Sequence, residues 1–195
     1  MKLAIFKETF PNEQRVAVIP AGLKTLQKLG LEVLVEEGAG LAAGHLDDEY
    51  RQAGAIITDR QTCFAADVLV HVRCAGANPN HAKNDFDNYR AGQVVLGTCD
   101  PLGEPHHIEA AAERGVSLLA LELIPRITRA QSMDVLSSMA SVAGYRAVIL
   151  AAAELPKMFP LMMTAAGTLS PARVFIVGAG VAGLQAIATA KRLGA

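Results

Sequence analysis

One short segment limits the possible folds of this chain more than any other. Residues 174–177 form an apolar run, VFIV, followed at once by GAGVAG over residues 178–183 and then by an alanine-rich stretch over residues 184–193. A glycine-rich turn between a buried strand and a helix is the arrangement that dinucleotide-binding α/β domains require. The segment therefore predicts a strand, a tight turn and a helix that belong to a parallel α/β sheet.

The spacing of the three glycines, G-x-G-x-x-G, has a physical reason at each position. Gly178 permits the tight turn, Gly180 leaves room for a pyrophosphate beside the main chain, and Gly183 lets helix and strand pack closely. The start of the helix also offers free N–H groups and a partial positive charge to phosphates. We expect the nucleotide to be bound by Gly178, Ala179, Gly180, Val181 and Gly183. The alternative is a purely structural glycine turn.

The second half of the dinucleotide fingerprint is an acidic residue about 20 positions further on, which binds the ribose. The chain ends at Ala195, directly after Gly194, where the second strand of the unit should begin. We therefore expect this unit to be truncated. The residues present do not distinguish NAD from NADP.

The preceding part of the chain alternates short apolar runs with helix-like segments. Strands are expected at residues 3–6, 31–35, 68–72, 94–96 and 116–121, and helices at residues 20–29, 47–53 and 105–114. Strands separated by helices of this length indicate βαβ units. The predicted fold class is α/β, with two Rossmann-like doubly wound parallel-sheet units, of which the second is incomplete.

A long helix is expected from about Met133 to near Pro156. Its apolar face is predicted from side chains that recur every three or four positions: Leu136, Met139, Ala140, Ala143, Ala147, Leu150 and Ala151. A helix between two α/β units is typical of an interdomain connector. We place the N-terminal domain at residues 1–132 and the connector with the nucleotide-binding unit at residues 133–195.

Composition excludes several classes of protein. Apolar residues make up 51% and charged residues 19% of the 195, so the chain is not intrinsically disordered. The net charge of −1 indicates no nucleic-acid partner. The three widely spaced cysteines are expected to be free thiols, with no metal site. The longest uncharged run, residues 174–190, is interrupted by glycines, so no transmembrane segment is expected.

Several blocks resemble a known family. The stretches PRITRAQSMDVLSSMASVAGYRAVILAA and MMTAAGTLSPARVFIVGAGVAGLQAIATAKRLGA closely resemble the α subunit of proton-translocating NAD(P) transhydrogenases. The opening KLAIFKETFPNEQRVAVIPAGLKTLQKLG resembles the N-terminal domain that transhydrogenases share with alanine dehydrogenases. The resemblance implies an NAD(H)-binding component that exchanges hydride with NADP(H) on a partner component, coupled to proton movement through a membrane component. It further implies a homodimer on the cytoplasmic side of the inner membrane, attached through its partner subunits.

The resemblance assigns cofactor-binding roles near the nicotinamide to Arg126, Gln131, Asp134 and Ser137, and a catalytic part to Gln131 and Asp134. An amide can hydrogen-bond a carboxamide or a ribose hydroxyl, and a guanidinium can pair with an acid or a phosphate. The alternative is structural: Ser132 as the N-cap of the helix, with Asp134 as a first-turn acid favoured by the helix dipole.

The rival function is NAD-dependent oxidative deamination by an alanine dehydrogenase. Arg15 and Arg73 stand where that family has its substrate arginine and a lysine, whereas Gly97 and Thr98 stand where its catalytic histidine should follow a strand. A missing base argues against deamination, and the histidines of this chain are expected to be surface or supporting residues. A third hypothesis is that this polypeptide binds nucleotide without catalysing anything alone.

Overall fold

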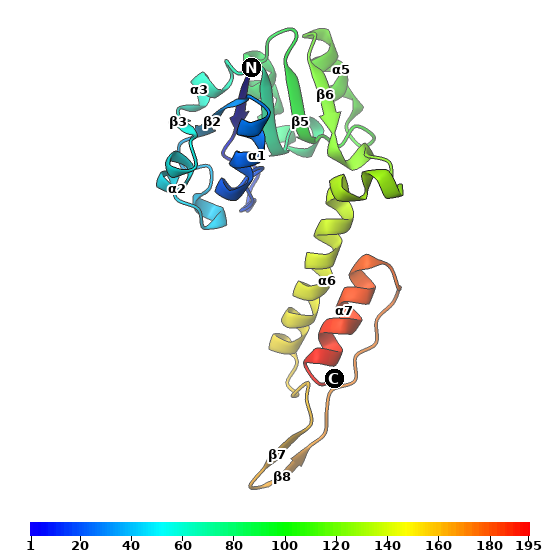
Figure 1. Cartoon of the computed structure of the whole chain (residues 1–195). Helices are drawn as coiled ribbons and strands as arrows, with labels where there is room; N and C mark the ends of the chain where they lie inside the picture. Colours follow the sequence, from blue (N-terminus) through cyan, green and yellow to red (C-terminus); the bar gives the residue numbers. More distant parts are fainter. The chain divides into compact units, whose positions relative to one another are not determined.

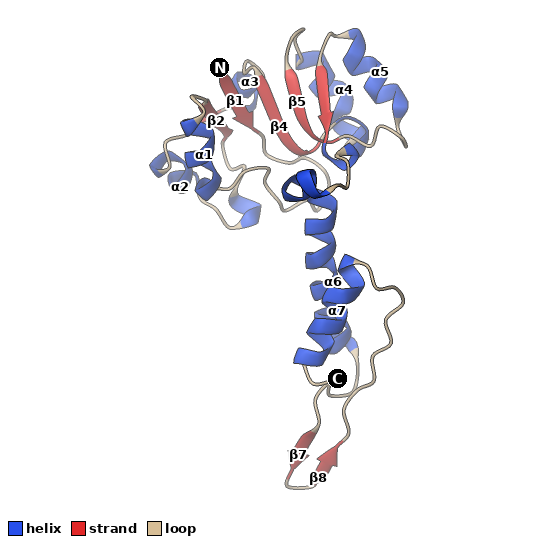
Figure 2. Ribbon diagram, turned by 45° about the vertical axis from the view of Figure 1, so that its right-hand side comes forward, coloured by secondary structure: helices blue, strands red, loops and turns tan.

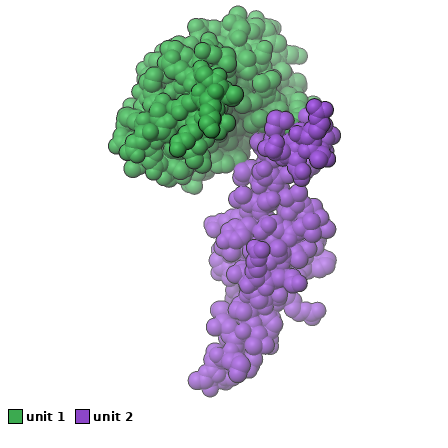
Figure 3. Space-filling model, viewed as in Figure 1, with its two compact units in different colours: residues 1–124 green, residues 125–195 purple.

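The computed structural model describes all 195 residues. They form two compact units, Met1–Ile124 and Pro125–Ala195, which Figure 3 colours separately. The division falls slightly earlier in the chain than the predicted boundary between residues 132 and 133, which stays a prediction.

The first unit is built on a six-stranded sheet, which confirms the α/β class. The strands are β1 (Lys2–Ile5), β2 (Glu32–Glu36), β3 (Ile56–Thr58), β4 (Val68–Arg73), β5 (Val94–Thr98) and β6 (Ser117–Ala120). Their order is β3-β2-β1-β4-β5-β6, and every neighbouring pair is parallel. The chain winds outward in both directions from the β1–β4 pair, so the topological switch point lies between these two strands.

Both faces of this sheet are buried, as crossover connections require of a parallel sheet. Along β1 and the residue after it, Ala4 and Phe6 face one core cluster, whereas Leu3 and Ile5 face the other. The helices lie on the two faces (Figure 2). They are α1 (Leu23–Lys28), α2 (Asp47–Gln52), α3 (Arg60–Cys63), α4 (Pro79–Asn88) and α5 (Pro105–Glu113).

The strands and helices predicted for this unit are all present, with ends that differ by one or a few residues. The prediction missed the short elements β3 and α3 and also α4, whose sequence PNHAKNDFDN has a polar average and gives little apolar signal. The three cysteines are free thiols, as expected, and all three are buried. Two of them, Cys74 and Cys99, lie with their Sγ atoms 3.4 Å apart.

The second unit contains two long helices and a hairpin. A 3-10 turn (Thr128–Met133) leads into α6 (Val135–Glu154), the hairpin of β7 (Met162–Thr164) and β8 (Gly167–Leu169) follows, and α7 (Val181–Arg192) ends the unit. Helices α6 and α7 lie side by side and run in the same direction (Figure 1). Their shared core contains Val148, Ala186 and Ala190.

The predicted long helix is present, but its predicted apolar face is not the face that is buried against α7. Leu136 and Leu150 are about half exposed, whereas Gly144 and Val148 are the buried residues of α6. The physical reason is the close approach of α7. A Cβ at position 144 would overlap the main chain of Ala182, so only glycine admits the second helix there.

The predicted strand at residues 174–177 is also wrong, because the segment is extended without strand pairing. A strand exists only through its hydrogen bonds to a neighbour, and the hairpin β7–β8 pairs with itself alone. Phe175 and Val177 are consequently 90% and 88% exposed, although their residue types suit a buried strand.

Helix α6 is the one helix long and apolar enough to cross a membrane, by length and composition only. Core helices of water-soluble proteins pass the same test. In this structure Gly144 and Val148 pack against α7, and Arg146 lies near the middle of the helix. The expectation of no transmembrane segment stays a prediction.

The contact at Gly144 gives a stability prediction. Gly144→Val should weaken the α6–α7 packing by about 1–3 kcal/mol, because the new side chain must displace the main chain of Ala182. The matched control is Ala143→Val, which places the same side chain at an exposed position of the same helix. Calorimetric unfolding of the two variants is the measurement. Equal shifts in transition temperature would show that helix propensity, and not the contact, determines the result.

Candidate functional site

The glycine turn has the conformation that its sequence predicts. Gly178 has a φ of +97°, in the region that L side chains rarely adopt. A Cβ at Gly183 would overlap the carbonyl of Gly178, so helix and turn are in main-chain contact. A Cβ at Gly180 would meet nothing within 4 Å, so open space lies beside the main chain there. Gly178 thus permits a left-handed turn, Gly180 leaves space beside the main chain, and Gly183 allows the helix to pack closely on the turn.

The turn also leaves the start of α7 free to bind an anion. Gly180 is the N-cap residue of this helix, and no side chain caps it or places a carboxylate in its first turn. The first N–H groups of a helix have no partner within the helix, and they carry the positive end of the helix dipole. Ala179 and Val181 flank Gly180 in this turn. The arrangement fits phosphate oxygens without further side chains.

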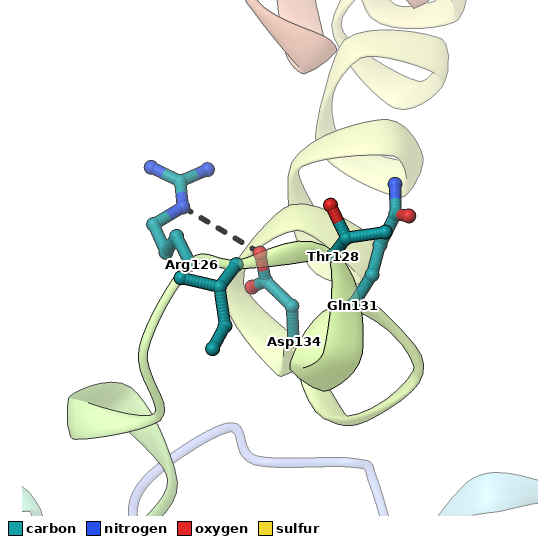
Figure 4. A pocket seen from close by; sticks show the side chains of 5 residues that line it. Arg126, Thr128, Gln131 and Asp134 are labelled. Carbon is teal, nitrogen blue, oxygen red and sulfur yellow. Dashed lines mark ion pairs between the residues drawn. The ribbon is translucent and has the colours of Figure 1, made fainter.

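The second group of predicted residues lies around the start of α6. A pocket of about 250 Å³ is lined by Arg126, Ile127, Thr128, Gln131 and Asp134 (Figure 4). Three of the four residues predicted for the nicotinamide end are therefore in one pocket. Ile127 and Thr128 were missed, although both stand within the RITRAQSMD block that carried the prediction.

Asp134 is the N-cap of α6, which corrects the alternative that gave this role to Ser132. One carboxylate oxygen accepts the Ser137 main-chain N–H at 2.8 Å, and the other accepts the Ser137 hydroxyl at 2.6 Å. These hydrogen bonds from Ser137, helped by the positive charge of Arg126, lower the pKa of the Asp134 carboxyl. Asp134 is therefore a carboxylate whose position is fixed by the helix start.

Arg126 completes this small network. Its guanidinium donates a hydrogen bond to Ser137 Oγ at 2.8 Å, and its Nε lies 3.5 Å from Asp134 Oδ2 (dashed line in Figure 4). The Arg126 side chain is 66% exposed, so much of it is available to a ligand. Gln131 is exposed and lies in the 3-10 turn that precedes α6. Its amide has no protein partner among the hydrogen bonds of this loop.

The glycine turn lies at the start of α7 and the pocket at the start of α6, two helices that pack side by side. Gly144 marks where α6 meets the start of α7, and Asp134 lies ten residues before it. At a rise of about 1.5 Å per residue, the two N-termini are separated along α6 by roughly 15 Å. Both helix starts face the same direction (Figure 1).

The first unit has a separate polar cluster at its switch point. Glu13 accepts hydrogen bonds from Arg15, at 2.7 and 2.6 Å, and from Arg73, at 3.0 Å. Hydrogen bonds from these partners, of which Arg15 has the larger effect, lower the pKa of Glu13 to about 2. Arg15 and Arg73 stand where the rival family has its substrate arginine and a lysine. In this chain both are paired with a carboxylate of the chain itself.

No imidazole stands beside this cluster. A side chain at Gly97 would meet the carbonyl of His71 and the sulfur of Cys74, and the Thr98 hydroxyl donates to the Val72 carbonyl at 2.6 Å. His71 itself is buried and stacked on Phe6. Burial lowers the pKa of His71 to about 3, so it stays neutral. The cluster lacks an accessible general base of the expected kind.

Known proteins match both the sheet unit and the glycine turn of this chain. The fold and the turn are those of the dinucleotide-binding α/β class. Residues 4–143 match the family model described as "Alanine dehydrogenase/PNT, N-terminal domain", and residues 147–195 match "Alanine dehydrogenase/PNT, C-terminal domain". The chain belongs to the alanine dehydrogenase/PNT family.

Within the family the chain is more similar to transhydrogenases. It is 50% identical to the first part of NAD(P) transhydrogenase subunit alpha of Rhodospirillum rubrum, over 100% of this chain and 51% of the relative. The crystal structure of transhydrogenase from Sinorhizobium meliloti superposes with a TM-score of 0.94 at 50% identity, covering 100% of this chain and 57% of that one. Alanine dehydrogenase of Bacillus subtilis is 31% identical, over 100% of this chain and 50% of the relative. The chain spans about half the length of these relatives.

A titration prediction comes from Glu8, next to the switch-point cluster. Glu8 accepts the main-chain N–H groups of Val72 and Arg73 at 2.6 and 3.1 Å. Burial outweighs these hydrogen bonds and raises the pKa of the Glu8 carboxyl from 4.5 to about 7. Between these two values the folded chain holds a proton that the unfolded chain has released, so stability falls as the pH rises.

We therefore expect the free energy of unfolding to decrease between pH 5 and pH 8 by up to about 3 kcal/mol from this group. Glu8→Gln, which cannot ionise, should lack that part of the slope. Urea unfolding of both proteins across the range is the measurement. A slope that is identical in the two proteins would contradict the assignment to Glu8.

Proposed function

We propose that this chain forms the NAD(H)-binding part of a proton-translocating NAD(P) transhydrogenase, which transfers hydride between NADH and NADP⁺. The observation that carries the proposal is the glycine turn at the start of α7, with open space at Gly180 and an uncapped helix N-terminus. The 50% identity to a transhydrogenase subunit, against 31% to an alanine dehydrogenase, favours this reaction over deamination.

The residues present fit a dinucleotide. The pyrophosphate would be held by main-chain N–H groups around Gly178, Ala179, Gly180, Val181 and Gly183, because a side chain at position 180 would fill the space that is open there. No acidic side chain in the first turn of α7 opposes a phosphate. A bound nicotinamide dinucleotide supplies the hydride, and no side chain needs to form a covalent intermediate.

The chain's own role in the chemistry would be positioning. Arg126, Gln131 and Asp134 line the pocket near the start of α6, roughly 15 Å along the helix from the turn. The Gln131 amide can bind a carboxamide or a ribose hydroxyl, and Asp134 can accept a hydrogen bond while Ser137 holds it in place. Misplacement of a reacting ring by about 1 Å can lower a rate on the order of a hundredfold.

Further components follow from the proposal. NADP(H) would bind to a partner component, and a membrane component would couple transfer to protons. We place the chain, as a homodimer, on the cytoplasmic side of the inner membrane through these partners. The relatives are named as subunits, which supports the existence of partners. The pairing of Glu13 with both Arg15 and Arg73 leaves no free cation pair for an amino-acid substrate.

The first test concerns ground-state binding. Gly180→Val should weaken NADH binding to this chain by more than about tenfold, since the added side chain occupies the space open to the pyrophosphate. Gly180→Ala should give a smaller loss in the same direction. NADH fluorescence titration measures the affinity, and far-UV circular dichroism verifies that the fold is retained. Unchanged affinity in the valine variant would make the turn purely structural.

The second test separates positioning from binding. Asp134→Asn keeps an N-cap for α6, because asparagine caps helices about as well as aspartate, but removes the charge. Gln131→Ala removes an exposed amide that caps nothing. In a component of full family length, combined with its NADP(H)-binding partner, each variant should slow hydride transfer at least about tenfold while NADH affinity changes less than about fivefold.

Stopped-flow transfer to an NADP analogue and equilibrium NADH titration give the two quantities. Equal losses in rate and affinity would assign these residues to plain binding. If Asp134→Asn changed neither the transfer rate nor the NADH affinity, Asp134 would serve only as a helix cap. A parallel assay with L-alanine and NAD⁺ should yield no NADH. A robust rate of NADH formation would contradict the proposed transhydrogenase reaction and favour deamination.

A further inference from the structure

Three metal-ligating side chains converge at the start of α5, in the first unit. Glu104, His106 and His107 each place one ligand atom within 4.8 Å of the other two. The Glu104 carboxylate lies 3.4 Å from His106 Nε2 and 3.8 Å from His107 Nδ1. All three come from the segment EPHH, whose histidines were expected to be surface or supporting residues.

Glu104 is the N-cap residue of α5, and its side chain makes no capping hydrogen bond. The main chain before it is held by a tight turn, in which Asp100 accepts the N–H groups of Gly103 and Glu104. The carboxylate is thus held beside the two imidazoles instead of the helix end.

His107 supplies a second, independent observation. Its Nδ1 atom is buried and has no hydrogen-bond partner, and the side chain is only 14% exposed. A buried nitrogen without a hydrogen-bond partner has lost its hydration, which costs free energy that no new hydrogen bond offsets. A neutral imidazole nitrogen offers a lone pair to a metal. A cation at the cluster would satisfy this atom.

We infer that Glu104, His106 and His107 form a site for a divalent transition metal, with Zn²⁺ as the probe of choice. Two imidazole nitrogens and one carboxylate oxygen are a donor set that Zn²⁺ accepts, with water in the remaining position. Tetrahedral ligands at bond lengths of about 2.1 Å lie roughly 3.4 Å apart. The separations of the Glu104 carboxylate from the two histidines, 3.4 and 3.8 Å, are near this value. Glu104 and His106 are the more exposed two of the three side chains.

The surroundings allow a cation to enter and stay. A pocket of about 330 Å³ adjoins both histidines and has room for water ligands. Two cations, Lys83 and Arg114, also line it, but Arg114 is paired with Asp87 at 2.7 Å. The charge that remains to oppose the metal is that of Lys83, on α4. The negative charge of the Glu104 carboxylate offsets this positive charge.

Calorimetric titration of ZnCl₂ into the tag-free chain at pH 7.5 tests the inference. We expect one equivalent to bind, with a gain in melting temperature, since a ligand that binds only the folded state stabilises it. His106→Gln and His107→Gln should each weaken binding by at least about tenfold, because each removes one of three donors. Co²⁺ absorption in the visible range reports the ligand number independently.

The matched control is His45→Gln. His45 lies 3.0 Å from the carboxylate of Glu49 on an exposed surface, but no second imidazole joins this pair. This variant should bind Zn²⁺ as the original chain does. Absence of stoichiometric binding, or equal losses in all three variants, would overturn the inference. Neither result bears on nucleotide binding, which depends on other residues.

Discussion

Main-chain N–H groups at the carboxyl ends of the parallel strands need hydrogen-bond partners, and acidic side chains supply them. Glu36, at the end of β2, accepts an N–H group just after β1, and Glu8, which follows β1, accepts two at the end of β4. Glu122, which follows β6, accepts two just after β5. Each carboxylate thus joins one strand end to its neighbour. A buried N–H group without a partner would cost free energy, so these acids hold the edge where such folds place their ligands.

The same pairing limits what this edge can do. Glu8 and Glu13 are carboxylates directed at chain groups, and Arg73 lies against the ring of Phe10 while it pairs with Glu13. A small acidic substrate would have to displace Glu13 from two guanidinium groups. The polar groups at this edge are consequently engaged with other groups of the chain. The uncapped start of α7, by contrast, has its N–H groups without side-chain partners.

The sequence predicted local features well and partner-dependent features poorly. The glycine turn was predictable because Gly178 needs a positive φ and Gly183 a missing side chain, and both needs are local. The buried face of α6 was not, since it depends on where α7 makes contact, and Gly144 gives no hydrophobic signal. Residues 174–177 have strand-like composition, but pairing decides whether a strand forms. Arg126, Gln131 and Asp134 were named from a resemblance, while the capping role of Asp134 became visible only with the Ser137 N–H group at 2.8 Å from its carboxylate.

The cap at Asp134 and a role in positioning a nucleotide are compatible, because they use different properties of the carboxylate. Capping needs oxygen atoms in reach of the Ser137 N–H group, which an asparagine also provides. The negative charge has another partner, Arg126, which is 66% exposed and reaches Asp134 only through Nε at 3.5 Å. An ion pair whose guanidinium is this exposed stabilises a fold little. The cap explains the position of the oxygens, and the charge beside an accessible guanidinium and the Gln131 amide is what a polar ligand can recognise.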